Sequence, residues 1–200
     1  MADDLFVLWL AAVPLMGSPG PATLSLAGIG TAFGFRRGLP YLLGIIIGTT
    51  MVLAMIATGI TALVLAEPAI VLALSAVAGL YILYLAWKIA TAPVGPRAPW
   101  RMTDAPTFMP GLALAVANPK AFAAIGAVYA GNGLVAGSPT ADAIAKTAAL
   151  AVVILVVNTA WLGFGAAFSR LLTDEVFGRA INIVFAALLI ASVALVFMTA

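Results

Sequence analysis

The stretch Gly17-Ser18-Pro19-Gly20-Pro21 interrupts a long apolar run that extends from about residue 5 to residue 35. Proline lacks a backbone donor and clashes with the preceding turn, so it costs about 3 kcal/mol or more inside a helix. The run is long enough to cross a bilayer, where freed backbone groups are tolerated only when protein buries them or when they line a watery cavity. The stretch therefore predicts either a plain structural kink or a functional break in a membrane helix.

The composition indicates an all-α integral membrane protein. The chain has 200 residues, of which 64% are hydrophobic and 8% charged, and its mean hydropathy is +1.20. A soluble domain is about 25% charged, and the roughly 10-residue alternation of a membrane barrel is absent. The chain has no cysteine and no histidine, so thiol chemistry and the commonest metal ligand are excluded and no cofactor is expected. The acidic start, Asp3-Asp4, favours a retained first helix over a cleaved signal peptide.

Six transmembrane spans are expected, in two halves that form one domain. A linker at 91–107, rich in proline, separates half one (about 1–90) from half two (about 108–200). Because each half has an odd number of spans, the halves are predicted to be inverted repeats, as in many secondary transporters. The expected spans are about 5–33, 39–65, 69–90, 108–129, 144–168 and 180–198.

Basic residues predict the orientation. Seven of them flank the loops after the first, third and fifth spans, whereas the opposite side has only Lys146. By the positive-inside rule those three loops are cytoplasmic, and both termini face outward. The seven residues are Arg36, Arg37, Lys88, Arg97, Arg101, Arg170 and Arg179.

A second interruption, Asn118-Pro119-Lys120, lies in the first span of half two. Pro119 follows Pro19 by 100 residues (119 − 19). Paired breaks at corresponding positions are the best sequence indication of a transporter's binding site, although plain kinks remain the alternative. Pro21 is suited to the first turn of a new helix, where the amides of Ala22, Thr23 and Leu24 would face an anion.

Lys120 is the only charged residue well inside an expected span. It lies about 20 Å along that span at 1.5 Å per residue, and a charge at such depth usually marks a substrate or ion pathway. The alternative is that the boundaries of this span are several residues away from those expected, which would put Lys120 at the outer interface. No aspartate or glutamate falls within a span, which disfavours a carboxylate proton relay or metal site.

Two further features have two interpretations each. Asn158, in the fifth span, either bridges two helices or contacts substrate. Gly44 and Gly48 are spaced for close helix approach, either within the chain or at a dimer seam.

Taken in order, these motifs resemble the LysE/RhtB family of amino-acid exporters. The resemblance rests on Pro19-Gly20-Pro21, on the glycines Gly34, Gly38, Gly44 and Gly48, on the run from Gly79 to Lys88, and on Phe108 to Gly111 leading to Asn118-Pro119-Lys120. It implies efflux of amino acids or their derivatives from a bacterial cytoplasm, driven by the proton gradient. The partners that it implies are the lipid bilayer, a small-molecule substrate and a second copy of the chain. It also implies that both proline motifs are functional. After Lys120 the chain departs from the family pattern, because it reads Ala-Phe-Ala-Ala where aromatic residues and a proline often follow.

We therefore expect an inner-membrane exporter rather than an enzyme. Lys120 and the amides after Pro21 would hold the substrate carboxylate, while Asn118 and exposed carbonyls would take its ammonium group. A passive channel and a membrane scaffold or assembly factor are the alternatives. The predicted substrate-binding residues are Pro19, Gly20, Pro21, Thr23, Asn118, Pro119, Lys120 and Asn158.

Overall fold

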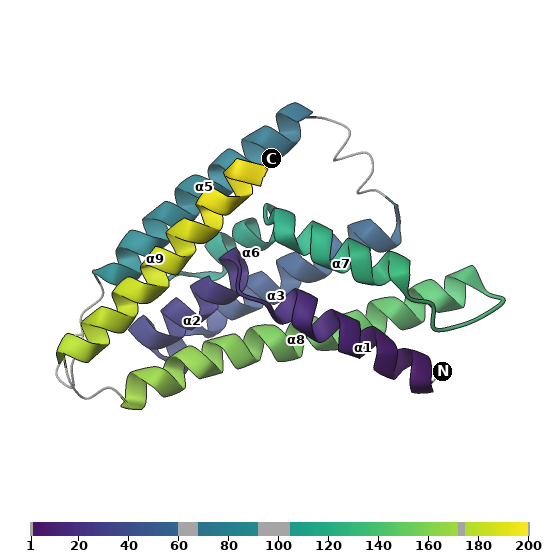
Figure 1. Cartoon of the computed structure of the whole chain (residues 1–200), viewed down its shortest axis with the longest axis horizontal. Coiled ribbons are helices and arrows are strands. Elements are labelled where there is room, and N and C mark those ends of the chain that lie inside the picture. Colours follow the sequence, from purple (N-terminus) through teal and green to yellow (C-terminus); the bar gives the residue numbers. More distant parts are fainter. Residues whose placement is uncertain (1, 60–67, 92–104, 172–174, 200) are drawn as a thin grey trace.

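The computed structural model describes residues 2–59, 68–91, 105–171 and 175–199. These residues form eight helices and no strand (Figure 1). The helices are α1 (Ala2–Gly17), α2 (Pro21–Phe33), α3 (Phe35–Ala57), α5 (Pro68–Ala90), α6 (Phe108–Val116), α7 (Pro119–Gly131), α8 (Pro139–Leu171) and α9 (Glu175–Thr199).

The chain bends sharply at both proline motifs. Helices α1 and α2 are bent by 66° across Ser18 to Gly20, and α6 and α7 by 58° across Ala117 and Asn118. Pro21 and Pro119 are the first residues of α2 and α7, where the missing backbone donor is harmless. Each bent pair is apolar and long enough, taken together, to cross a membrane.

Helices α3 and α8 are long and apolar enough to cross a membrane individually. Helix α3 begins at Phe35, four residues before the expected start at 39, and residues 60–67 after it lie outside the described part. Helix α8 begins at Pro139, five residues before the predicted start. Ser138 precedes it and its Oγ accepts from the N–H of Ala141 at 3.3 Å, which makes the prolyl residue a helix start and not part of a loop.

Helices α5 and α9 run side by side along the upper left of Figure 1. Helix α9 begins at Glu175, so Arg179 lies in its first turns and not in the predicted loop. Its Nη1 donates to the carbonyl of Ala90 at 2.6 Å, which satisfies the C-terminal end of α5. Most of the predicted linker, residues 92–104, lies outside the described residues.

Glycines bring the two halves of the chain into backbone contact. The most extensive contacts are those of α3 with α6 and of α2 with α8. A Cβ on Gly44 would overlap the carbonyl oxygen of Phe108, and one on Gly165 would overlap that of Ala27. A Cβ on Gly48 would meet the carbonyl of Leu112 at 2.8 Å. Internal packing is thus the correct interpretation of the spacing between Gly44 and Gly48.

Much of the outer surface is apolar, and several polar side chains are buried between the helices. Large apolar side chains on several helices are exposed, among them Phe6 (66%), Leu80 (69%) and Trp87 (64%). Buried polar side chains include Ser25, whose Oγ accepts from the Tyr41 hydroxyl at 3.1 Å. This distribution suits lipid outside the helices, and polar contacts inside.

Candidate functional site

Side chains from other helices satisfy the backbone at the first break. The Trp161 indole on α8 donates to the carbonyl of Gly17 at 3.0 Å, and so covers the last residue of α1. Thr23 acts from the other side, because its Oγ1 accepts from the N–H of Gly20 at 2.9 Å and also contacts the carbonyl of Ser18 at 3.2 Å. The break is therefore a defined backbone conformation that α2 and α8 hold in place.

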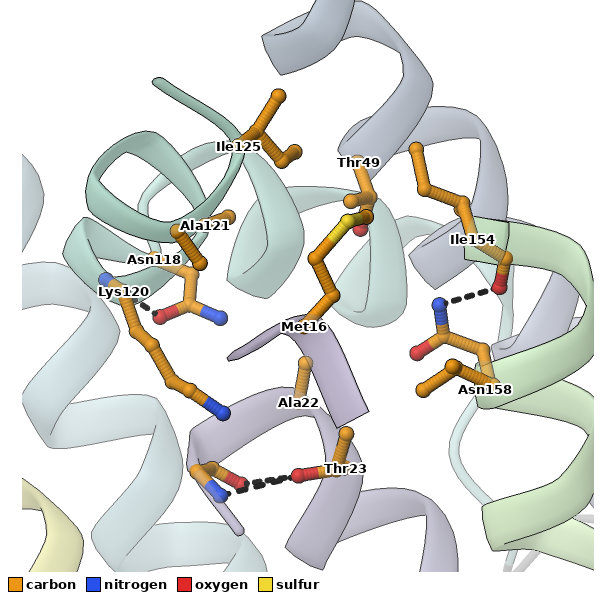
Figure 2. Close-up of a pocket in the computed structure, with 13 residues that line it drawn as sticks. Met16, Ala22, Thr23, Thr49, Asn118, Lys120, Ala121, Ile125, Ile154 and Asn158 are labelled. Carbon is orange, nitrogen blue, oxygen red and sulfur yellow. Dashed lines mark hydrogen bonds between the residues drawn. The ribbon is translucent and has the colours of Figure 1, made fainter. Parts of the chain in front are cut away.

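The second break is held locally. Asn118 is buried, and its Oδ1 accepts from the N–H of Lys120 at 3.2 Å, which makes it the N-cap of α7. This is the standard use of asparagine at a helix start. Its amide nitrogen points toward the space between the helices in Figure 2.

The Lys120 side chain crosses from the second break to the first. Its ammonium donates to the carbonyl of Ser18 and, at 3.4 Å, to that of Pro19. Figure 2 shows the side chain reaching from α7 toward the start of α2. Within the described residues no carboxylate pairs with this ammonium. The arrangement differs from the expected one, in which these carbonyls were open to a substrate's ammonium group. The reason is that a helix C-terminus favours a cation, and the Lys120 ammonium lies within hydrogen-bond distance of these carbonyls.

A pocket lies between the two breaks, with walls from α1, α2, α3, α7 and α8. Its empty volume, including the open mouth, is about 440 Å³. Asn158 lines it from α8: its amide nitrogen donates to Ile154 in the same helix at 2.7 Å, and its oxygen points toward the pocket in Figure 2. Within the part of the chain that the structure describes, no hydrogen bond joins Asn158 to a second helix, and its position favours the interpretation as a substrate contact.

The pocket is lined by five of the predicted substrate-binding residues, which come from distant segments of the chain. The three predicted prolines do not line it; they set the backbone course instead. The amide of Leu24 is not available to an anion, because it donates to the carbonyl of Gly20 at 2.8 Å within the first turn of α2. The predicted residues that line the pocket are Gly20, Thr23, Asn118, Lys120 and Asn158.

Several residues at this site were not predicted from the sequence. Met16 and Thr49 line the pocket, and Trp161 holds the first break. Thr49 is buried, and with Thr50 it forms a polar pair inside an apolar span, which is a signal that could have been used. Met16 gave no such signal, because apolar residues occur throughout the chain. Trp161 lies three positions after Asn158 in the same span, but the sequence does not indicate which group its indole contacts.

The electrostatics of the pocket suit a molecule that carries both charges. The carbonyls at the C-terminal end of α1 attract a cation, a place that the Lys120 ammonium takes in this structure. The N-termini of α2 and α7 attract an anion. Lys120 adds one full positive charge. Among the described residues no group of histidine, cysteine, aspartate or glutamate could hold a metal ion.

Comparisons with known proteins point to a transporter family. The family model for the LysE type translocator matches residues 13–200. The "Cysteine/O-acetylserine efflux protein" of Escherichia coli O1:K1 / APEC is 30% identical over 190 residues, 93% of either chain. The protein of the same name from Salmonella choleraesuis (strain SC-B67) is 37% identical over 89 residues, so the match spans about half of its length, 46%, and 44% of this chain. No solved structure matches.

Proposed function

Because this chain belongs to the LysE type translocator family, we propose that it exports small zwitterionic amino acids and their derivatives from the cytoplasm. The family consists of transporters, not enzymes, and the apolar helices agree with a multi-pass protein of the inner membrane. The observation that carries the proposal is the pocket between the two helix breaks.

The pocket provides a separate partner for each charge of an amino acid. We place the substrate's carboxylate against Lys120 and the start of α2, and its ammonium against the carbonyl end of α1. Asn118 and Asn158 are the neutral groups that would orient the rest of the polar end. The remaining wall is apolar, with Met16, Ala121, Ile125 and Ile154, so a short uncharged side chain would suit it best.

The names of the relatives favour a small polar side chain. The Escherichia coli protein, which aligns along almost all of this chain, is named for the efflux of cysteine and O-acetylserine. Both are small neutral amino acids, in agreement with the pocket. O-Acetylserine is therefore the first substrate to test here.

For the transport cycle we propose inverted repeats and proton-driven export. Each half of the chain begins with a bent helix pair, α1–α2 or α6–α7. Helix α2 of the first half packs against α8 of the second, and α6 of the second half packs against α3 of the first. This is the arrangement expected when two repeats rock around a shared site. The excess of basic residues around three helix connections supports, by the positive-inside rule, cytoplasmic connections there and termini that face outward.

Export from loaded cells tests the proposal. Cells that produce the protein should release O-acetylserine faster than cells without it, and a proton uncoupler should abolish the difference. Release that an uncoupler leaves unchanged would favour a passive channel. No release of any amino acid, with the protein present in the membrane, would favour the scaffold alternative.

A further inference from the structure

The ammonium group of Lys120 occupies the place where a substrate's ammonium would bind. It donates to the carbonyls of Ser18 and Pro19, directly after the last turn of α1. Two carbonyls at a helix C-terminus are a good site for any primary ammonium ion, because both the hydrogen bonds and the helix dipole favour it. A free amino acid carries the same group.

Gly20 provides the room for the lysine to lie there. Its backbone is extended (φ −173°, ψ 178°), so the conformation itself does not require glycine. The space does, because a Cβ at this position would lie 2.6 Å from Cδ and 3.1 Å from Nζ of Lys120. The first break is thus shaped around a side chain that comes from the other half of the chain, 102 residues later.

We infer that the Lys120 ammonium and the substrate's ammonium compete for the same two carbonyls. In the empty carrier the lysine ammonium occupies the two carbonyls and ties α7 to the first break. When an amino acid binds, its own ammonium takes the carbonyls, and Lys120 turns to the carboxylate. This inference rests on the proposed function and adds an exchange step to it.

The charges balance through this exchange. The empty pocket has one positive charge, held by carbonyls. A zwitterion brings no net charge, so the occupied pocket has one ammonium on the carbonyls and one lysine paired with a carboxylate. A molecule with an amine but no carboxylate would instead bring two cations together without an anion, which is unfavourable at this short range. A molecule whose amine is acylated cannot displace the lysine. The exchange therefore selects for a free amine and a free carboxylate together.

Three ligands separate this exchange from a purely structural role for Lys120. O-Acetyl-L-serine has both groups, L-serine methyl ester has only the amine, and N-acetyl-L-serine has only the carboxylate. Binding to the purified protein in lipid nanodiscs is measured by calorimetry. Wild type should bind O-acetylserine, bind the methyl ester at least tenfold more weakly, and not respond to N-acetylserine.

The variant Lys120→Met should move two affinities in opposite directions. The methyl ester should bind at least tenfold more tightly, because the carbonyls are vacated and the repelling charge is gone. O-Acetylserine should bind at least tenfold more weakly, because its carboxylate loses a partner. A change of both affinities in the same direction, or no gain for the methyl ester, would overturn the inference.

Gly20→Ala displaces the lysine without removing it, and so provides a second test. The methyl ester should again gain affinity, by a few-fold, whereas the matched variant Gly126→Ala should bind like wild type, because nothing lies within 4 Å of a Cβ there. Equal behaviour of the two alanine variants would contradict the inference. Failure of wild-type cells to export amino acids would contradict the proposed function instead. The binding of the methyl ester to purified protein tests the inference separately from export.

Discussion

At the break between α6 and α7 the chain caps itself, whereas at the break between α1 and α2 it depends on distant residues. Asn118 bonds the N–H of Lys120, two positions away. The carbonyls of Gly17 and Ser18 are instead bonded by Trp161 and Lys120, which are 144 and 102 residues away along the chain. A local cap forms whenever its helix forms, but a distant one forms only in one arrangement of the helices. The first break is therefore the one whose bonding can change during transport.

The largest expected effect follows from Lys120→Met. Export of O-acetylserine should fall at least tenfold, because one charge-assisted partner contributes about 1.5–3 kcal/mol. Thermal stability should change much less, since the lost bonds to two carbonyls are offset by removal of a charge that costs about 2.5–3.5 kcal/mol at mid-membrane. Efflux from cells and the melting temperature of purified protein measure the two effects. Lys88→Met is the control and should export normally; a similar loss there would show that any lost lysine has this effect.

A smaller effect is expected for Trp161→Phe. The ring remains, but the carbonyl of Gly17 loses its donor. The expected loss of stability is about 1 kcal/mol, or about 2–4 °C in melting temperature. Trp87→Phe, at a position that is 64% exposed, should leave the melting temperature unchanged. If the two variants melted alike, the indole would not be a functional cap of α1.

Thr23→Val tests the remaining contact at the first break. Valine keeps the shape but removes the oxygen that accepts from the N–H of Gly20. We expect a loss of about 1 kcal/mol, together with weaker export, because the start of α2 faces the pocket. Thr23→Ser keeps the hydroxyl and should retain export. A serine variant as impaired as the valine variant would assign the effect to the methyl group.

The smallest effect on transport is expected when the cap of the second break is removed without loss of the pocket's charge. Asn118→Ala should lower stability by about 1 kcal/mol, the usual value for a lost N-cap. Asn118→Ser should restore that stability, because serine is an equally good cap, but should not restore any contact that the asparagine amide makes with substrate. Stability and export measured on both variants separate capping from substrate contact. If Ser restored export in full, the amide would have only the structural role.

The sequence was sufficient to locate both breaks and the charge between them. Proline and glycine destabilise the interior of a helix, so their positions in an apolar run are enough to indicate a break. A single lysine in such a run is equally easy to find. It was not sufficient to show which carbonyls Lys120 would meet, because that depends on how α7 packs beside α1. Trp161 was missed for the same reason. The start of α8 at Pro139 was missed because a proline after a serine reads equally well as a turn or as a helix start.

The distant caps of the first break also constrain the order in which the protein can be assembled. A nascent chain inserts its N-terminal segments first, when the lysine and the tryptophan that satisfy the carbonyls of Gly17 and Ser18 have not yet been synthesised. Until they arrive, the carbonyl of Ser18 has only the Thr23 hydroxyl as a donor. The carbonyl of Gly17 must be met by water or by the insertion machinery, because hydrocarbon offers no donor. Half one is therefore expected to settle in the bilayer only after α7 and α8 have joined it. Truncation before α7 should accordingly yield a fragment that is degraded, and separate co-expression of the missing half should rescue it.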